Sequence, residues 1–186
     1  MRLKNLYTKI IRRIIKENEK TIHVEAFIRE DVWNNLKKLI GNQYTWFITT
    51  PANYDYCRCY FNLKVTKEEF TNILKNRIGF LKDHNEEIQL HLHLCNVKNF
   101  LDKDLQDEKF EEAMMFMHDV AVKPIKFAPG WNAYDDYTLK LVKKYGFKYL
   151  YVYTKEPLDL NRPHIKNGLI IKYYSKFWHD YDFIKN

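Results

Sequence analysis

The sequence contains few of the residues that build linkers, repeats or disulfide frameworks. Of its 186 residues, five are glycine and five are proline, and no stretch is rich in serine and glycine. We also find no repeat at the periods that mark solenoid or propeller proteins. A chain of this length can bury one substantial core, so we expect a single domain over residues 1–186 without an internal linker.

Cysteine and long apolar runs are scarce as well. The three cysteines are Cys57, Cys59 and Cys95, and the first two stand too close together for an ordinary disulfide framework. No stretch of 18 apolar residues occurs, and the amino terminus lacks the apolar centre of a signal peptide. We therefore expect a soluble, cytoplasmic protein with no transmembrane segment.

Positive charge is present in excess, but no single segment concentrates it. The 31 lysine and arginine residues outnumber the 24 aspartate and glutamate residues, which gives a net charge of +7. These basic residues are spread along the chain instead of forming a tail or patch. No nucleic-acid-binding motif accompanies them, so we do not expect a nucleic-acid partner.

Strand and helix patterns alternate along the chain. Residues 1–20 place apolar side chains on one helical stripe, which predicts an amphipathic N-terminal helix that covers one side or end of the domain, with membrane-surface or dimer contact as alternatives. Strands are predicted at residues 21–28, 45–51, 87–95, 124–130, 147–154 and 168–174. Helices are predicted at residues 31–41, 66–81, 106–122 and 134–146, and a tyrosine-rich loop at residues 52–64. The alternation favours a parallel α/β sheet or barrel, in which ligands bind at the carboxyl ends of the strands.

Two histidines share one face of the strand EIQLHLHLC. Side chains two positions apart on a strand point to the same face, so His91 and His93 lie on one side and the leucines between them on the other. His23 and Glu25 share a face of the first strand in the same way. Imidazole, carboxylate and the thiol of Cys95 all bind zinc or a similar divalent ion. On spacing alone, however, such a pair is more often structural than metal-binding.

The segment FAPGWNAYDDYTLKLVKKYGFKYLYVY, residues 127–153, resembles part of the polysaccharide deacetylases, carbohydrate esterase family 4. The family pattern is F-R-P-P-[YW]-G, a T-L-K-L helix, a K-x-x-G-[YF] helix end and a strand. The positions in step with it are Phe127, Pro129, Trp131, Thr138, Leu139, Gly146 and Phe147. EIQLH resembles the E-I-G-x-H start of the family's histidine motif, and TWFITTP resembles the A-T-F-F-V strand before it. The resemblance implies a small, distorted (β/α) barrel over residues 21–175.

The resemblance also implies a divalent metal, often zinc, held by one aspartate and two histidines. In the family the metal polarises an acetamide carbonyl and activates water, an aspartate acts as base and a histidine protonates the leaving amine. His91 matches the first metal-binding histidine of H-[ST]-x-x-H. The second falls at Cys95, so either Cys95 ligates the metal or His93 replaces the missing ligand, and we favour His93. Glu25 is the nearest acidic candidate, with Asp31 as an alternative.

Much of the family's catalytic machinery is missing from this sequence. The first-strand motif T-F-D-D-G is absent, and Ala128 stands where the family has the arginine that orients its base. The histidine of the late L-x-H motif is absent from residues 168–174, which leaves His164 and His179 as distant substitutes. We therefore assign no catalytic residue from the sequence.

Two related functions follow from the sequence. The first is a divergent metal-dependent hydrolase of amide bonds on N-acetylated sugars or related small substrates, with Glu25, His91 and His93 as ligands of a divalent metal, zinc. The second keeps the fold, has no catalysis and binds carbohydrate in its cleft. In both cases Trp131 and Tyr54 are the expected substrate-binding residues, because aromatic rings stack on sugars.

Overall fold

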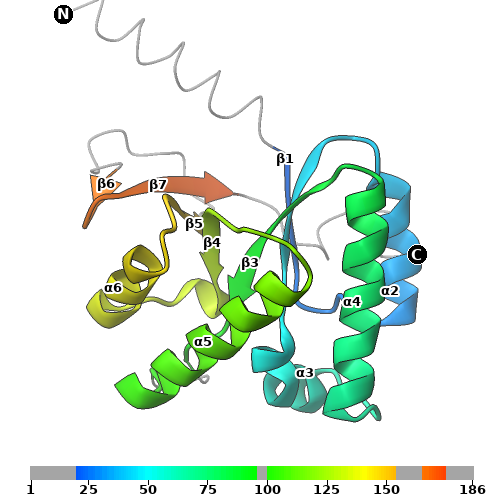
Figure 1. Ribbon diagram of the computed structural model, residues 1–186, viewed down its shortest axis with the longest axis horizontal. Helices are drawn as coiled ribbons and strands as arrows, with labels where there is room; N and C mark the ends of the chain where they lie inside the picture. The colour runs from blue at the N-terminus through cyan, green and yellow to red at the C-terminus, as the bar shows by residue number, and fades with distance from the viewer. Residues whose placement is uncertain (1–19, 96–99, 154–164, 175–186) are drawn as a thin grey trace, which may run out of the picture.

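A seven-stranded sheet forms the centre of the protein, with helices along its outer side (Figure 1). The computed structural model describes residues 20–95, 100–153 and 165–174. The predicted N-terminal helix lies outside the described residues apart from Lys20, which begins the first strand. Within the described ranges, no helix has both the length and the apolar character needed to cross a membrane.

The strands follow one another across the sheet in chain order. β1 (Lys20–Val24), β2 (Tyr44–Ile48), β3 (Glu87–Leu92), β4 (Lys126–Pro129) and β5 (Tyr149–Tyr153) are parallel neighbours, β7 (Leu169–Tyr174) is parallel to β5, and β6 (Ile165–Lys166) pairs antiparallel with β7. Crossovers between consecutive parallel strands have one hand, which places the helices on one face and curls the sheet. In the described sheet β1 and β6 are edge strands that do not pair with each other, so the curled sheet stays open and forms a half-barrel. The predicted α/β class and barrel-type strand order are confirmed.

The helices occupy the connections between parallel strands. They are α2 (Glu30–Leu36) with the 3₁₀ turn η1 (Lys37–Leu39), α4 (Lys67–Asp83), α5 (Lys103–Asp119) and α6 (Asp136–Lys144), with the shorter η2 (Pro51–Asn53), α3 (Tyr54–Tyr60) and η3 (Gly130–Asn132). A capping box is present at the start of α4. The amide of Glu69 donates to Thr66 Oγ1 (3.2 Å), and the amide of Thr66 donates to Glu69 Oε2 (2.7 Å).

The two faces of the sheet have different environments. The outer face packs against the helices and forms the main apolar core, which includes Ile22, Val24, Trp46, Ile48, Leu90, Leu92, Phe127 and Leu150. The inner face carries His23, His91 and a small separate cluster of Phe47, Ala128 and Tyr151. Because side chains alternate along each strand, the apolar positions of the outer face send the histidines to the interior of the half-barrel.

The structure corrects the prediction of a loop at residues 52–64. Most of this segment is helical, as η2 and α3, since Tyr54, Cys57 and Phe61 pack against the core at helical spacing. Most predicted strands are also shorter than expected, and two of these differences concern the site. β1 ends at Val24 and β3 at Leu92, so Glu25 and His93 each follow the carboxyl end of a strand.

Candidate metal centre

Glu25, His91 and His93 meet at the carboxyl ends of β1 and β3. The two imidazole Nε2 atoms are 3.2 Å apart, and Glu25 Oε1 lies 3.5 Å from His91 Nε2 and 3.3 Å from His93 Nε2. Within the described part of the chain, this is the one group of His, Cys, Asp or Glu side chains whose donor atoms all lie within 4.8 Å of one another. The structure therefore brings together the three residues that the sequence singled out.

The spacing of these atoms fits a tetrahedral metal site. Zinc binds imidazole nitrogen and carboxylate oxygen at about 2.0–2.2 Å, so neighbouring ligand atoms of a tetrahedral ion stand about 3.3–3.5 Å apart. The three measured separations, 3.2, 3.3 and 3.5 Å, agree with this value. Two imidazoles and one carboxylate also leave a fourth position open, as catalytic zinc sites do. The donor set fits a divalent ion.

The ionisation of the donors also suits metal binding. Burial opposes the charge on Glu25, but hydrogen bonds from His91 and His93 outweigh this effect and hold the pKa of Glu25 well below its usual range. Burial lowers the pKa of His93 to about 4; the hydrogen bond to Glu25 opposes this shift and the charge of His91 adds to it. At neutral pH Glu25 is ionised and His93 is neutral, which are the forms that bind metal ions.

The remaining ring nitrogens depart from the usual pattern of metal-bound histidine. A ligating histidine normally donates its second N–H to a carboxylate, carbonyl or water. Here Nδ1 of His91 and Nδ1 of His93 are both buried, and neither has a hydrogen-bond partner among the described residues. The ring of His93 is held by packing instead, since it stacks on Tyr56 with ring centroids 3.8 Å apart.

A buried asparagine fixes the backbone that carries the two histidines. Asn53, in η2, donates from Nδ2 to Thr49 Oγ1 (2.9 Å) and to the carbonyl oxygen of His91 (3.4 Å), while its Oδ1 accepts from the amide of His93 (3.1 Å). These bonds tie the chain after β2 to the end of β3. Sequence reasoning missed Asn53 because it read this segment as a loop; the signal was Pro51 at the first position of a helical turn.

Aromatic rings line one side of the cluster. Trp131, in η3, lies edge-on to His93 and to Tyr56, with centroids 6.0 and 6.1 Å apart, and Tyr60 lies 5.8 Å from Trp131. Trp131 is 45% exposed and Tyr60 is 58% exposed, so this aromatic wall faces solvent. Trp131, which the sequence suggested as a substrate-binding residue, lies beside His93.

The other predicted substrate-binding residue, Tyr54, faces the core. Its hydroxyl donates to the carbonyl oxygen of Val65 (2.9 Å), and its ring lies edge-on to Phe70 at 5.6 Å. None of the contacts recorded for Tyr54 reaches the cluster. Tyr54 therefore packs against the core, and Tyr60 is the tyrosine of α3 that lies beside Trp131 together with Tyr56.

The alternative ligands lie apart from the three donors. Cys95 is buried and its backbone bridges to Phe100, and burial raises the pKa of its thiol. Asp31 is exposed and accepts a hydrogen bond from Arg29 Nε at 3.0 Å. Neither belongs to the group formed by the three donors. His164 and His179, the distant substitutes for the late histidine, lie outside the described residues.

Ala128, the position at which the sequence resemblance leads one to expect an arginine, lies next to His91. Ala128 pairs with His91 across β3 and β4, and it is fully buried against Phe47 and Tyr151. No second carboxylate joins the donor group in the described residues.

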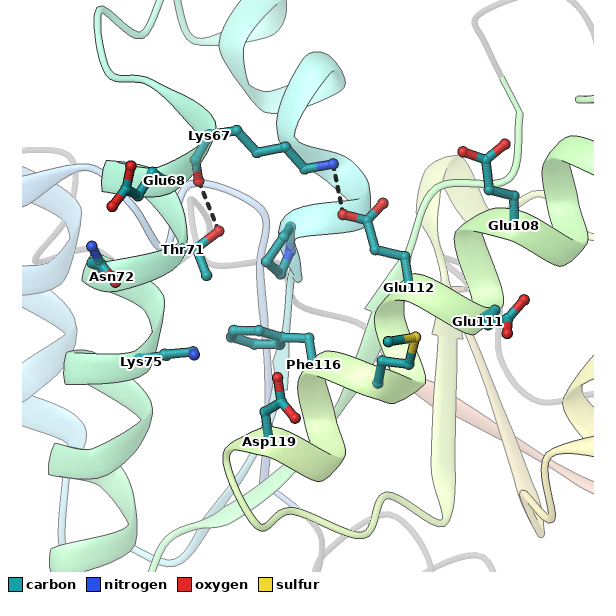
Figure 2. Close-up of a pocket in the computed structure, with 12 residues that line it drawn as sticks. Lys67, Glu68, Thr71, Asn72, Lys75, Glu108, Glu111, Glu112, Phe116 and Asp119 are labelled. Carbon is teal, nitrogen blue, oxygen red and sulfur yellow. Dashed lines mark hydrogen bonds and ion pairs between the residues drawn. The ribbon is translucent and has the colours of Figure 1, made fainter.

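A separate groove lies on the outer side of the molecule, between α4 and α5 (Figure 2). The residues that line it are Pro51, Lys67, Glu68, Thr71, Asn72, Lys75, Glu108, Glu111, Glu112, Met115, Phe116 and Asp119. Lys67 Nζ bridges the groove to Glu112 Oε1 at 2.7 Å. None of the three donors lines this groove, and its charged side chains are those of two solvated helix faces.

Comparison with known proteins gives a distant structural similarity. No protein-family model and no curated protein matches the chain. The chain is similar to three solved structures: a family 4 carbohydrate esterase from Streptomyces lividans (12% identity, TM-score 0.49), a protein named as a polysaccharide deacetylase from Mycobacterium smegmatis (14%, 0.47), and one named as a polysaccharide deacetylase involved in O-antigen biosynthesis from Bordetella bronchiseptica (13%, 0.45).

These similarities extend over much of this chain but less of the others. They cover 73%, 73% and 83% of this chain, and 62%, 50% and 56% of the respective solved chains. The chain thus spans between half and two thirds of the length of the structures it matches.

Proposed function

We propose that this protein is a divergent metal-dependent hydrolase of the amide bond on an N-acetylated sugar or a related small substrate. The observation that carries the proposal is the convergence of Glu25 Oε1, His91 Nε2 and His93 Nε2 within 3.2–3.5 Å of one another. They lie at the carboxyl ends of parallel strands, where α/β folds place their ligand sites. The substrate class rests on the sequence resemblance, since the donor geometry alone does not select a sugar.

Each proposed ligand has a defined part. A zinc ion held by Glu25, His91 and His93 would supply a Lewis acid for the amide carbonyl and would activate water for attack on it. Glu25 provides the negative charge of the site, and both histidines present Nε2 to it. Trp131 and Tyr60 provide a solvent-facing aromatic surface on which a sugar ring can stack.

One observation favours a second function, a carbohydrate-binding protein without catalysis. Ala128 is buried where the family has an arginine, and no second carboxylate joins the three donors within the described ranges. A hydrolase of this kind then lacks the acid–base pair that usually adds a factor of about 10²–10⁴ to the rate. Catalysis, if present, is expected to be slow and to depend strongly on the metal.

Acetate release from N-acetylglucosamine oligomers separates the two functions. The zinc- or cobalt-loaded protein should release acetate, and chelation or His91→Gln should abolish this release. His118→Gln is the matched control, because His118 is exposed in the last turn of α5 and makes no contact with the cluster. Oligomer binding that is insensitive to chelation, together with no acetate release, would support the binding protein and overturn the hydrolase.

A further inference from the structure

Tyr56 contacts two of the three proposed ligands at once. Its hydroxyl donates to Glu25 Oε2 at 3.2 Å, and its ring stacks on His93 with a centroid separation of 3.8 Å and an interplanar angle of 22°. Glu25 directs its other oxygen, Oε1, to both histidines. One side chain therefore restrains the rotation of the carboxylate and the plane of one imidazole.

We propose that Tyr56 is a positioning residue of the metal centre, which holds Glu25 Oε1 and His93 Nε2 in the arrangement that binds a divalent cation. The inference rests on the proposed function, because it concerns the same three donors. It goes further by assigning the affinity of the site to a residue that is itself no ligand.

The need for such a residue follows from where Glu25 lies. It follows the last residue of β1, in a turn, so the strand does not fix its side chain. A glutamate side chain has several rotatable bonds, and ordering it costs conformational entropy. The hydrogen bond from Tyr56 selects the rotamer in advance, as outer hydrogen bonds do for metal-binding carboxylates.

The helix that carries Tyr56 is itself anchored to the same turn. Cys57 is fully buried, and its Sγ lies 3.8 Å from the carbonyl oxygen of Glu25 and 3.8 Å from Thr49 Oγ1. Asn53, one residue before α3, is bonded to the backbone of His91 and His93. The start of α3 is therefore tied to both strand ends that supply the ligands.

The hydrogen bond from Tyr56 matters more because, among the described residues, no hydrogen bond reaches Nδ1 of His91 or Nδ1 of His93. Neither Nδ1 atom of the pair finds an acceptor in the described residues, so the hydroxyl of Tyr56 supplies a hydrogen bond that supports the donor set from outside. Burial, and then the charge of Glu25, raise the pKa of Tyr56, so its hydroxyl keeps the proton that it donates.

Tyr54 offers a matched control on the same helix. Its hydroxyl donates to the carbonyl oxygen of Val65, away from the three donors. Tyr56→Phe removes the hydroxyl and keeps the ring that stacks on His93, while Tyr54→Phe removes the same group at a position without contact to the site. Tyr56→Leu is a second variant that removes both the hydroxyl and the stacking ring.

The test is the affinity of chelator-treated protein for Zn²⁺ and Co²⁺, measured by competition with a chromogenic chelator, together with the visible spectrum of the Co²⁺ form. We expect Tyr56→Phe to weaken binding by about 10- to 100-fold and to shift the Co²⁺ spectrum, as loss of an outer-shell partner does. Tyr56→Leu should weaken binding further, and Tyr54→Phe should bind as the unaltered protein does.

The outcomes separate this inference from the proposed function. If the unaltered protein binds metal and Tyr56→Phe binds it equally well with an unchanged spectrum, the positioning role is wrong and the metal site stands. If Tyr54→Phe and Tyr56→Phe weaken binding equally, the effect belongs to the stability of α3, and the positioning role is again wrong. If the unaltered protein binds no metal, the metal site fails and the inference fails with it.

Discussion

Gly130 lies directly against the imidazole ring of His93. A Cβ atom at position 130 would stand 2.2 Å from His93 Cγ and 2.3 Å from His93 Nδ1, closer than any Cβ contact in real proteins. The end of β4 thus approaches the end of β3 so closely that only glycine fits there. Any side chain at position 130 would push against the imidazole ring of His93. Substitution at this position is therefore a sensitive test of the site.

Replacing Gly130 by alanine should displace the ring of His93. Overpacking of this kind costs about 1–3 kcal/mol of folding stability, and we expect metal affinity to fall at least tenfold as His93 Nε2 moves from the other donors. Gly79→Ala is the control, because Gly79 lies inside α4 with nothing within 4 Å of the added Cβ. It should stabilise the protein by about 0.5–1 kcal/mol. Metal titration measures the affinity of both variants, and urea unfolding measures their stability. Unchanged metal affinity in Gly130→Ala would contradict the assignment of His93 as a metal ligand.

The metal-free protein should lose stability in mild acid. Burial lowers the pKa of His93 from 6.5 to about 4, so the unfolded chain binds more protons than the folded protein between these values. Stability is therefore complete above about pH 6.5, and up to about 3 kcal/mol is lost as the pH falls to 4. The lowered pKa of Glu25 acts in the same direction as the pH falls through its lower range.

Urea unfolding from pH 4 to 7.5, with chelator present, measures this effect. His93→Gln should have a flatter stability profile than the unaltered protein in this window. His118→Gln should keep the original profile, since His118 is exposed. An unaltered protein whose stability does not change between pH 6.5 and 4 would show that His93 is not buried as described.

Asn53→Ala should destabilise the protein more than an ordinary surface change. The substitution leaves the buried amide of His93 without its acceptor and removes the bonds to Thr49 and His91. Leaving a buried donor unpaired costs about 1–3 kcal/mol. Asn72→Ala, on an exposed position of α4, should change stability by less than about 0.5 kcal/mol. Denaturant titrations of the two variants should differ accordingly, and equal midpoints would contradict the role of Asn53.

Trp131→Ala should weaken the binding of N-acetylglucosamine oligomers and leave the metal affinity unchanged. The ring is 45% exposed and lies edge-on to His93. We therefore expect it to contact a bound sugar and to contribute little to holding His93 in place. Loss of an aromatic stacking partner weakens the free energy of binding by about 0.5–1.5 kcal/mol, which raises the dissociation constant up to about tenfold. Calorimetry with the oligomer and a separate zinc titration check the two halves of this prediction. A weakened metal site with unaltered oligomer binding would reverse the assignment of Trp131.

Local pattern predicts the α/β fold, and the family resemblance added to that pattern singles out the donor residues. Contacts that depend on packing between distant segments were not predicted. Alternation along EIQLHLHLC placed His91 and His93 on one face, and Glu25 was the acidic residue at the end of the first strand pattern. The predicted strands nonetheless ran past Val24 and Leu92, because a pattern of apolar residues does not show where hydrogen bonding to the next strand stops. The apolar pattern continues into the turn that holds Glu25.

The surroundings of the donors were not predictable in the same way. Side chains that are two residues apart on a helix point in nearly opposite directions, so Tyr54 and Tyr56 face different sides of α3. With residues 52–64 taken as a loop, nothing in the sequence distinguished these tyrosines, and Tyr54 was chosen as the sugar-binding residue. Asn53 was invisible for a related reason, because its partners are about 40 residues away in the chain.

Bound metal per chain tests the central claim most directly. The protein, prepared without a histidine tag, is loaded with zinc, dialysed and measured by mass spectrometry beside Glu25→Gln, His93→Gln and Cys95→Ser. We predict about one zinc ion per chain in the unaltered protein and in Cys95→Ser, and none retained in Glu25→Gln or His93→Gln, because Cys95 lies outside the donor group. No stoichiometric zinc in the unaltered protein, or zinc that is lost in Cys95→Ser and kept in His93→Gln, would contradict the account.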